Sequence, residues 1–144
     1  MKIMICGSMS FSKEMLDAKK GLEELGHSVK VPCDIDMHLD DSGFIDNLDA
    51  DYEHCVENNT MKTCMDKIDE SDAILVMNHP KNGVSGYVGT STLMEIGLAY
   101  YLGKKIFLMF STPLSSEARW AHEVRIMQPV VLGGDLGKIA QDGS

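Results

Sequence analysis

The sequence lacks the features that would place it in a membrane or in an oxidising compartment. No apolar run among its 144 residues approaches the length that spans a bilayer. The N-terminal segment also lacks the longer apolar stretch and the cleavage site of a signal peptide. The four cysteines form no Cys-x-x-Cys pair, and their spacing to histidine matches no standard zinc site. We therefore expect a cytoplasmic protein with reduced thiols, no membrane partner and no metal.

Positive charge is scarce as well, since 13 Lys and Arg stand against 22 Asp and Glu, for a formal net charge of −9. This balance argues against a nucleic-acid partner. It still permits a small anionic ligand, because local backbone N–H groups can outweigh net charge. The turn Gly7–Ser12 lacks the full Gly-x-Gly-x-x-Gly spacing of a dinucleotide site. Aromatic residues make up only 6% of the chain, which weakens the case for a flavodoxin-like FMN protein, so we expect no cofactor.

Short apolar runs alternate with segments of helical spacing along the whole chain, and no linker or repeat divides it. Such alternation predicts a single α/β domain over residues 1–144, a Rossmann-like or flavodoxin-like doubly wound parallel sheet of about five strands. The acidic stretch Cys33–Asp51 is expected to form a loop over the site. The expected strands are Lys2–Cys6, His27–Pro32, Asp72–Met77, Lys104–Phe110 and Pro129–Leu132. The expected helices lie in Ser12–Leu25, Tyr52–Glu70, Gly86–Gly103 and Ser115–Met127, with a possible turn of helix at Asp135–Ala140.

The stretch Gly86–Gly103 holds one acid, Glu95, in a helix that is otherwise apolar on nearly every side. Helices of this kind are usually buried, so the carboxylate requires an explanation. One explanation is a capping box, in which Thr92 caps the helix and Glu95 reaches back to the Thr92 N–H. The other is a catalytic carboxylate at the mouth of a cleft, because ligands of open α/β sheets bind at the carboxyl ends of strands.

Polar and glycine-rich turns follow two of the expected strands. Glycines before Glu95 let backbone N–H groups approach a ligand closely, and the strand before that loop ends in Asn78 and His79. The first strand runs into Gly7 and three serines. Those serines either cap the following helix or hold a phosphate.

The order of these motifs resembles the nucleoside 2-deoxyribosyltransferase superfamily, which includes the deoxynucleoside 5′-monophosphate N-glycosidases. The matching motifs are Cys6-Gly7-Ser8, Ser71–Val76, Gly89-Thr90, Glu95–Ala99 and Leu102–Ile106. The resemblance is densest over residues 71–110. The polar first turn is nearer to the monophosphate N-glycosidases than to the transferases of free nucleosides.

The resemblance implies cleavage of the N-glycosidic bond of a nucleoside or its 5′-monophosphate, by hydrolysis or transfer. It assigns the nucleophile to Glu95 and a second catalytic position to Asp72. It also implies a homodimer or higher homo-oligomer with a small-molecule nucleoside or nucleotide as ligand. The residues expected to bind substrate are Gly7, Ser8, Ser10, Asn78, Tyr87, Gly89, Thr90 and Ser91. Asp72, His79 and Tyr87 are the candidates for protonating the leaving base.

Two other functions remain open from the sequence. One is a phosphoribohydrolase of the cytokinin-activating type, whose Gly-rich loop is loosely echoed by Val88-Gly89-Thr90 and Glu95. The other is a nucleotide-binding sensor without turnover, since no acid stands just before Gly89-Thr90, where the transferases usually carry an aspartate.

Overall fold

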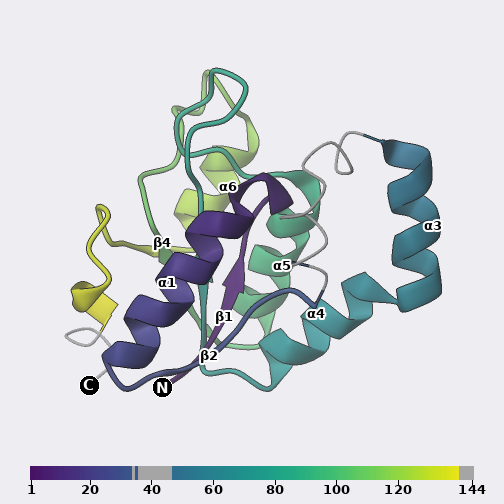
Figure 1. Ribbon diagram of the computed structural model, residues 1–144. Helices are drawn as coiled ribbons and strands as arrows, with labels where there is room; N and C mark the ends of the chain where they lie inside the picture. The colour runs from purple at the N-terminus through teal and green to yellow at the C-terminus, as the bar shows by residue number, and fades with distance from the viewer. Residues whose placement is uncertain (34, 36–46, 140–144) are drawn as a thin grey trace.

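A five-stranded, wholly parallel sheet forms the centre of the computed structural model, which describes residues 1–33, 35 and 47–139 (Figure 1). The strand order is β2-β1-β3-β4-β5. This is the flavodoxin-like order, in which the chain reverses direction across the sheet between β1 and β3. The predicted fold class is therefore confirmed. The strands are β1 (Lys2–Cys6), β2 (Ser28–Lys30), β3 (Ala73–Val76), β4 (Lys105–Leu108) and β5 (Val130–Val131).

Helices cover both faces of the sheet because the strand residues are apolar on both sides. Ile3 and Ile5 of β1 pack in a cluster with α1 (Ser12–Glu24), which follows the short 3-10 helix η1 (Met9–Phe11). Met4 and Cys6 point to the other face. That face is covered by α4 (Thr60–Asp69), α5 (Thr90–Tyr101) and α6 (Trp120–Ile126). The segments that follow the carboxyl ends of β1 and β3 border a cavity at that edge of the sheet.

The helix expected over Tyr52–Glu70 is wrong as a single element. The structure has two helices, α3 (Leu48–Asn58) and α4, because Asn59 adopts a left-handed conformation with φ of 52°. Asparagine tolerates that conformation better than most residues. Helix α3 buries none of its residues and stands apart from the sheet in Figure 1. Most of the acidic stretch expected to cover the site lies outside the described residues, and its end is helical from Leu48.

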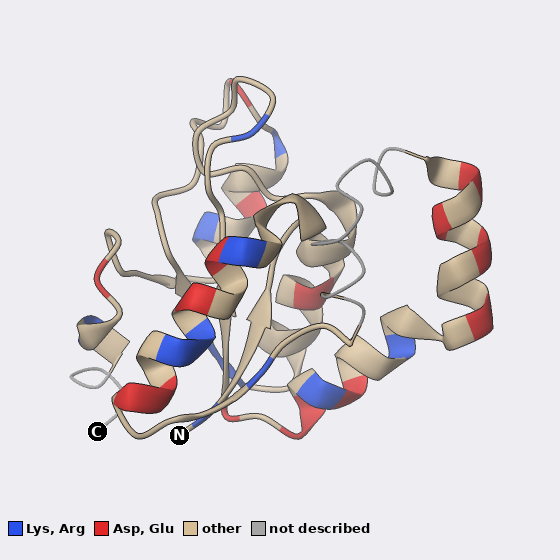
Figure 2. Ribbon diagram, viewed as in Figure 1, with Lys and Arg blue, Asp and Glu red and all other residues tan. Residues whose placement is uncertain are grey.

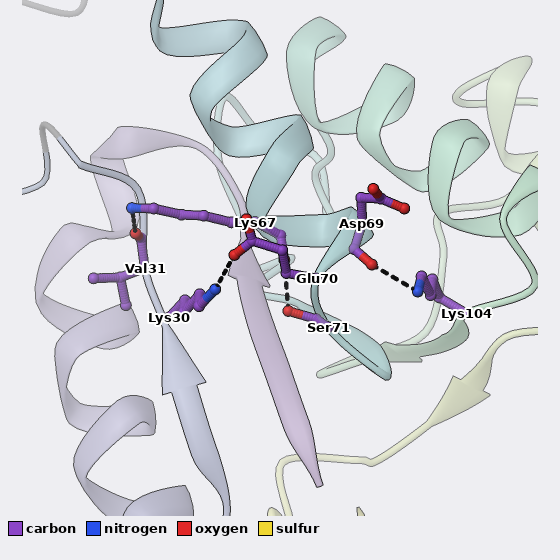
Figure 3. A network of polar contacts seen from close by, with 7 residues as sticks. All are labelled: Lys30, Val31, Lys67, Asp69, Glu70, Ser71 and Lys104. Carbon is purple, nitrogen blue, oxygen red and sulfur yellow. Dashed lines mark hydrogen bonds and ion pairs between the residues drawn. The ribbon is translucent and has the colours of Figure 1, made fainter.

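A network of polar contacts holds the carboxyl end of α4 against the sheet (Figure 3). Lys67 Nζ donates to the carbonyl of Val31 at 2.8 Å, and Ser71 Oγ donates to the carbonyl of Lys67 at 2.6 Å. Lys104 Nζ donates to the carbonyl of Asp69 at 2.8 Å. Lys30 pairs with Glu70. These contacts tie α4 to the segments next to β2 and β4, so the face that α4 turns toward the cavity described below is set by the sheet.

Other boundaries differ modestly from the expectation. Helix α6 begins at Trp120 rather than at Ser115, and residues 115–117 form turns. A helical turn is present at residues 137–139. Within the described part of the chain, no helix is long and apolar enough to cross a membrane.

Candidate active site

A cavity of about 370 Å³ opens at the carboxyl edge of the sheet, on the side of α4 and α5. Its size lies within the range of small-molecule sites, about 300–1,000 Å³. Four parts of the chain line it: the turn after β1, Pro32 after β2, the loop before α5 with the first turns of that helix, and the faces of α3 and α4. The lining residues include Gly7, Ser8, Lys81, Tyr87, Gly89, Thr90, Ser91, Thr92 and Glu95.

Glu95 lines this cavity from α5, and the structure excludes the capping box. Helix α5 begins at Thr90, with Gly89 in the N-cap position and no side-chain cap. Glu95 is therefore the sixth residue of the helix, beyond the first turn in which an acid can reach back to the N-cap. The capping interpretation is wrong, because it placed the start of the helix three residues too late.

The surroundings of Glu95 disfavour its charge. Burial raises the pKa of this carboxyl to about 7, since the charged form loses solvation in the protein. Behind it, β1 ends in the buried thiol of Cys6. Burial raises the pKa of that thiol well above its usual range, and the nearby charges of Glu95 and Cys64 raise it further. Glu95 thus changes protonation near neutral pH, while Cys6 stays a neutral thiol beside it.

The loop before α5 carries a cation into the cavity. Asn82 and Gly83 both have positive φ, 54° and 76°, and Lys81 and Val84 exchange backbone hydrogen bonds across them. This is the geometry of a type I′ turn. It directs Lys81 Nζ to Ser8 Oγ at 3.2 Å, with the ammonium 5.3 Å from the centre of the Tyr87 ring. Lys81 is the one cation among the described residues that line the cavity.

Ser8 is held in place to present its own hydroxyl proton. Its Oγ accepts from the Ser10 backbone N–H at 3.3 Å and from Lys81 Nζ at 3.2 Å. A hydroxyl has two acceptor lone pairs and one donor hydrogen. With both lone pairs engaged, the Ser8 O–H is left to donate to an acceptor. Ser8 and Lys81 together are therefore suited to an anionic group.

Two glycines allow the turns of the site to pack closely. A Cβ on Gly86 would lie 2.2 Å from the Ser111 carbonyl oxygen, and a Cβ on Gly7 would lie 2.9 Å from Met15 Cε. Gly86 has φ of 74°, in the left-handed region where glycine is favoured. Neither position accommodates a side chain without a shift of its neighbours. The loop that carries Lys81 is thus fixed against the segment after β4.

The structure brings together seven of the ten predicted site residues and separates three. Gly7, Ser8, Tyr87, Gly89, Thr90, Ser91 and Glu95 line the cavity. Ser10 does not line it; its side chain is exposed and its backbone N–H supports Ser8. The prediction that the Ser10 side chain faces the ligand is therefore corrected.

Asn78 is fully buried and has a structural contact in place of a ligand contact. Its Nδ2 donates to the Phe110 carbonyl at 2.7 Å, and its Oδ1 accepts from the Phe110 N–H at 2.8 Å. The amide thereby replaces the next step of the ladder between β3 and β4. Asn78 is absent from the cavity lining, so its predicted substrate role is corrected as well.

Asp72 lies at the wrong end of β3 for a catalytic role at this cavity. It precedes the strand, and its Oδ2 accepts from the Lys2 backbone N–H at 2.8 Å. The strand and its flanking residues separate it from the carboxyl edge by about 15–20 Å at about 3.3 Å per residue. The residue stands one position before the first residue of β3, and its carboxylate holds the start of β1.

His79, a candidate for protonating the leaving base, packs between two aromatic rings. Its ring centre lies 5.2 Å from that of Phe11 and 5.1 Å from that of Phe110. It does not line the cavity. Tyr87 does, and it is the one of the three candidates that the structure keeps at the site. Within the described residues, no group of three or more His, Cys, Asp or Glu side chains could hold a metal ion.

Lys81 and the cavity-lining faces of α3 and α4 were not predicted from the sequence. The Asn82-Gly83 dipeptide was a usable signal, because Asn-Gly is the commonest I′ turn and predicts that the loop folds back on itself. No comparable signal marked the break at Asn59, which places both helix faces at the cavity.

No protein-family model and no curated protein matches the chain. Among solved structures, it is similar to that of the CMP N-glycosidase BcmB of Clostridium botulinum. The two are 21% identical, the match covers 86% of this chain and 82% of that chain, and the TM-score is 0.46. At this level of similarity the activity in that name describes that protein alone.

Proposed function

We propose that this chain cleaves the N-glycosidic bond of a nucleoside 5′-monophosphate, with Glu95 as the nucleophile, and that it belongs to the superfamily its motifs resemble. The observation that carries the proposal is the cavity itself. It combines a carboxylate with no capping role, whose pKa is about 7, with a hydroxyl and an ammonium suited to an anion. These are the groups that a phosphorylated sugar and its anomeric carbon require.

The phosphate is placed against Ser8, Lys81 and the start of α5. Ser8 and Lys81 donate hydrogen bonds, and the ammonium adds a charge that phosphate prefers. The first backbone N–H groups of α5 have no side-chain cap and border the same cavity. Helix N-termini favour anions through these N–H groups and the helix dipole. The negative net charge of the chain is thus outweighed locally.

The sugar then lies over Glu95, about one and a half turns further along α5. One Glu95 oxygen attacks the anomeric carbon as the bond to the base breaks, and the electron pair of that bond leaves with the base. The departing nitrogen takes up a proton, for which the Tyr87 hydroxyl is the available side chain of the predicted set. Water hydrolyses the resulting glycosyl ester and restores Glu95. A second base in place of water would give transfer.

The test is base release from a panel of nucleosides and nucleoside 5′-monophosphates, ribo and 2-deoxy, followed by chromatography. We expect release from monophosphates and none from the Glu95→Gln variant. Addition of a free base separates transfer from hydrolysis, because transfer yields a new nucleotide. Thermal stabilisation by nucleotides without release from any compound would reject the proposal and favour a sensor. Release confined to ribonucleotides would favour the phosphoribohydrolase type.

Substitution of Lys81 tests the proposed phosphate contact directly. A charge-assisted hydrogen bond contributes about 1.5–3 kcal/mol, so Lys81→Gln should lower kcat/KM for monophosphates by about 10- to 100-fold. Activity on free nucleosides, if measurable, should not change. Lys62, which pairs with Asp66 on the outer face of α4, provides the control variant Lys62→Gln. An equal loss for nucleosides and monophosphates would show that Lys81 does not bind the phosphate.

A homo-oligomer remains part of the proposal. Leu48, Tyr52 and Val56 of α3 are spaced by four residues and are all largely exposed, as is Tyr101 at the end of α5. Exposed apolar stripes of this kind mark contact surfaces. Helix α3 also carries four acids and no Lys or Arg (Figure 2), so two α3 helices would repel each other, and we expect α3 to contact a different part of a second copy. Light scattering that shows a monomer at working concentration would reject this.

A further inference from the structure

The part of the cavity wall that α3 and α4 contribute is rich in sulfur. Two helix faces form it. Met61, Cys64 and Met65 are spaced i, i+3, i+4 on α4, and Cys55 comes from α3; all four line the cavity. We call these four residues the sulfur wall. The left-handed turn at Asn59 joins the two helices and brings both faces to one cavity.

We infer that the sulfur wall holds the nucleobase and accepts purines and pyrimidines alike; this rests on the proposed function of the same site. A flat aromatic ring fits such a wall because thioether and thiol groups are polarizable and make favourable contacts with aromatic rings. Methionine has three rotatable bonds in its side chain and adapts to partners of different size. The wall also borders Glu95, since Cys6 lies near both Glu95 and Cys64, so the base of a sugar placed over Glu95 can reach it.

The chemistry of the sulfur wall predicts weak discrimination between different bases. A pocket that discriminates by apolar contacts separates substrates differing by a methylene by about 10- to 200-fold, whereas a pocket that hydrogen-bonds the substrate reaches about 10⁴-fold or more. Among the described residues of α3 and α4 that line the cavity, the polar side chains other than the cysteines are Asp51 and Thr60. Thr60 is buried, and Asp51 Oδ1 contacts Cys55 Sγ at 3.7 Å. One carboxylate can accept from an amino group on either ring size, so it does not distinguish purine from pyrimidine.

The first experiment measures where the base lies, independently of turnover. The full-length Glu95→Gln variant is treated with N-ethylmaleimide in the presence of AMP, CMP or ribose 5-phosphate, and the labelling rate of each cysteine is followed by mass spectrometry. At ten times its Kd, a ligand that covers Cys64 should slow its labelling about tenfold. We expect AMP and CMP to do so and ribose 5-phosphate, which has no base, to leave Cys64 reactive.

Cys33 is the internal control, because it is exposed and does not line the cavity. Its labelling should be the same with every ligand. Equal protection of Cys64 by ribose 5-phosphate and by the nucleotides would overturn the placement of the base. Protection of Cys64 by only one of AMP and CMP, each supplied at ten times its own Kd, would overturn the claim that purines and pyrimidines both bind the sulfur wall.

The second experiment changes the size of the wall. Met61 is 44% exposed and lines the cavity, whereas Met94 of α5 is 47% exposed and does not. Met61→Trp should therefore lower kcat/KM for purine monophosphates at least tenfold more than for pyrimidine monophosphates, while Met94→Trp should alter neither. In the unmodified protein, kcat/KM should vary by no more than about 200-fold between the two classes.

The outcomes separate this inference from the proposed function. Base release with a purine-to-pyrimidine ratio beyond about 10³, or without protection of Cys64, would overturn the inference and leave the N-glycosidase in place. Protection of Cys64 by both nucleotides without any base release would reject the N-glycosidase and support the wall as the base-binding surface of a sensor.

Discussion

Replacing Glu95 by glutamine removes a carboxyl group whose charge the folded protein disfavours. The pKa of this group is about 7 in the folded chain against 4.5 for an unperturbed glutamate. Between these values the folded state binds more protons than the unfolded state, so the stability of the wild-type protein falls as pH rises. Each pKa unit corresponds to about 1.4 kcal/mol, which gives a loss of at most about 3 kcal/mol above pH 7.

The Glu95→Gln variant does not titrate at this position and should escape that loss. Its unfolding free energy should match the wild type at pH 4 and exceed it by up to about 3 kcal/mol at pH 8. For a chain of this length, the corresponding rise in Tm is on the order of 10 °C. The same variant should lose base release, because amides do not act as carboxylate nucleophiles. A gain of stability with a loss of activity is the pattern expected of a residue kept for chemistry.

The assay is urea unfolding followed by circular dichroism at several pH values from 4 to 8. Glu117, exposed in the turn before α6, supplies the control Glu117→Gln, which should change stability by less than about 0.5 kcal/mol at every pH. Destabilisation by Glu95→Gln at all pH values, as expected for the loss of a capping acid, would refute the reasoning. In the wild type, kcat/KM should rise with pH around an apparent pKa near 7, because attack requires the ionised carboxylate.

Three further substitutions test the corrected roles and the packing of the site. Gly86→Ala should destabilise the protein by about 2–4 kcal/mol, against about 1 kcal/mol for Gly83→Ala. Both glycines have φ near 75°, but only Gly86 has a carbonyl where its Cβ would stand, so equal losses would count against the clash. Asn78→Ala should lower the unfolding free energy by about 2–5 kcal/mol by leaving the Phe110 backbone unpaired; unchanged stability with a raised KM would restore its substrate role. Asp72→Ala should cost about 1 kcal/mol of stability and leave kcat intact, whereas a 100-fold fall in kcat would return it to the reaction.

The sequence pattern around Glu95 identified the important residue but did not predict where its helix begins. The isolated acid in an apolar helix identified the residue to explain, and the alternation of strands and helices implied that such helices begin at the ligand edge of the sheet. The same residues also formed a Thr-x-x-Glu pattern, which is a local signal for a cap. The helix begins at Thr90 rather than after Thr92, because the choice between adjacent starts depends on how the preceding loop packs.

The predicted roles of Asn78 and Asp72 differ from their contacts in the structure for a related reason. A polar residue next to a strand end can face a ligand or replace a backbone partner, and its type and position are the same in both cases. Asn78 binds the Phe110 backbone and Asp72 binds the Lys2 backbone, and both partners are distant in sequence. Such pairings depend on the register between strands, which no local pattern contains.

The sequence by itself determined the alternation of strands and helices, the apolar character of each strand on both faces, and therefore a parallel sheet with a polar edge at its carboxyl ends. Those properties follow from the periodicity and composition of short segments, which act locally. Only the tertiary structure decided that Lys81 reaches Ser8 across 73 positions, and that the break at Asn59 turns two helix faces toward Glu95. These depend on contacts between segments that meet only once the chain has folded.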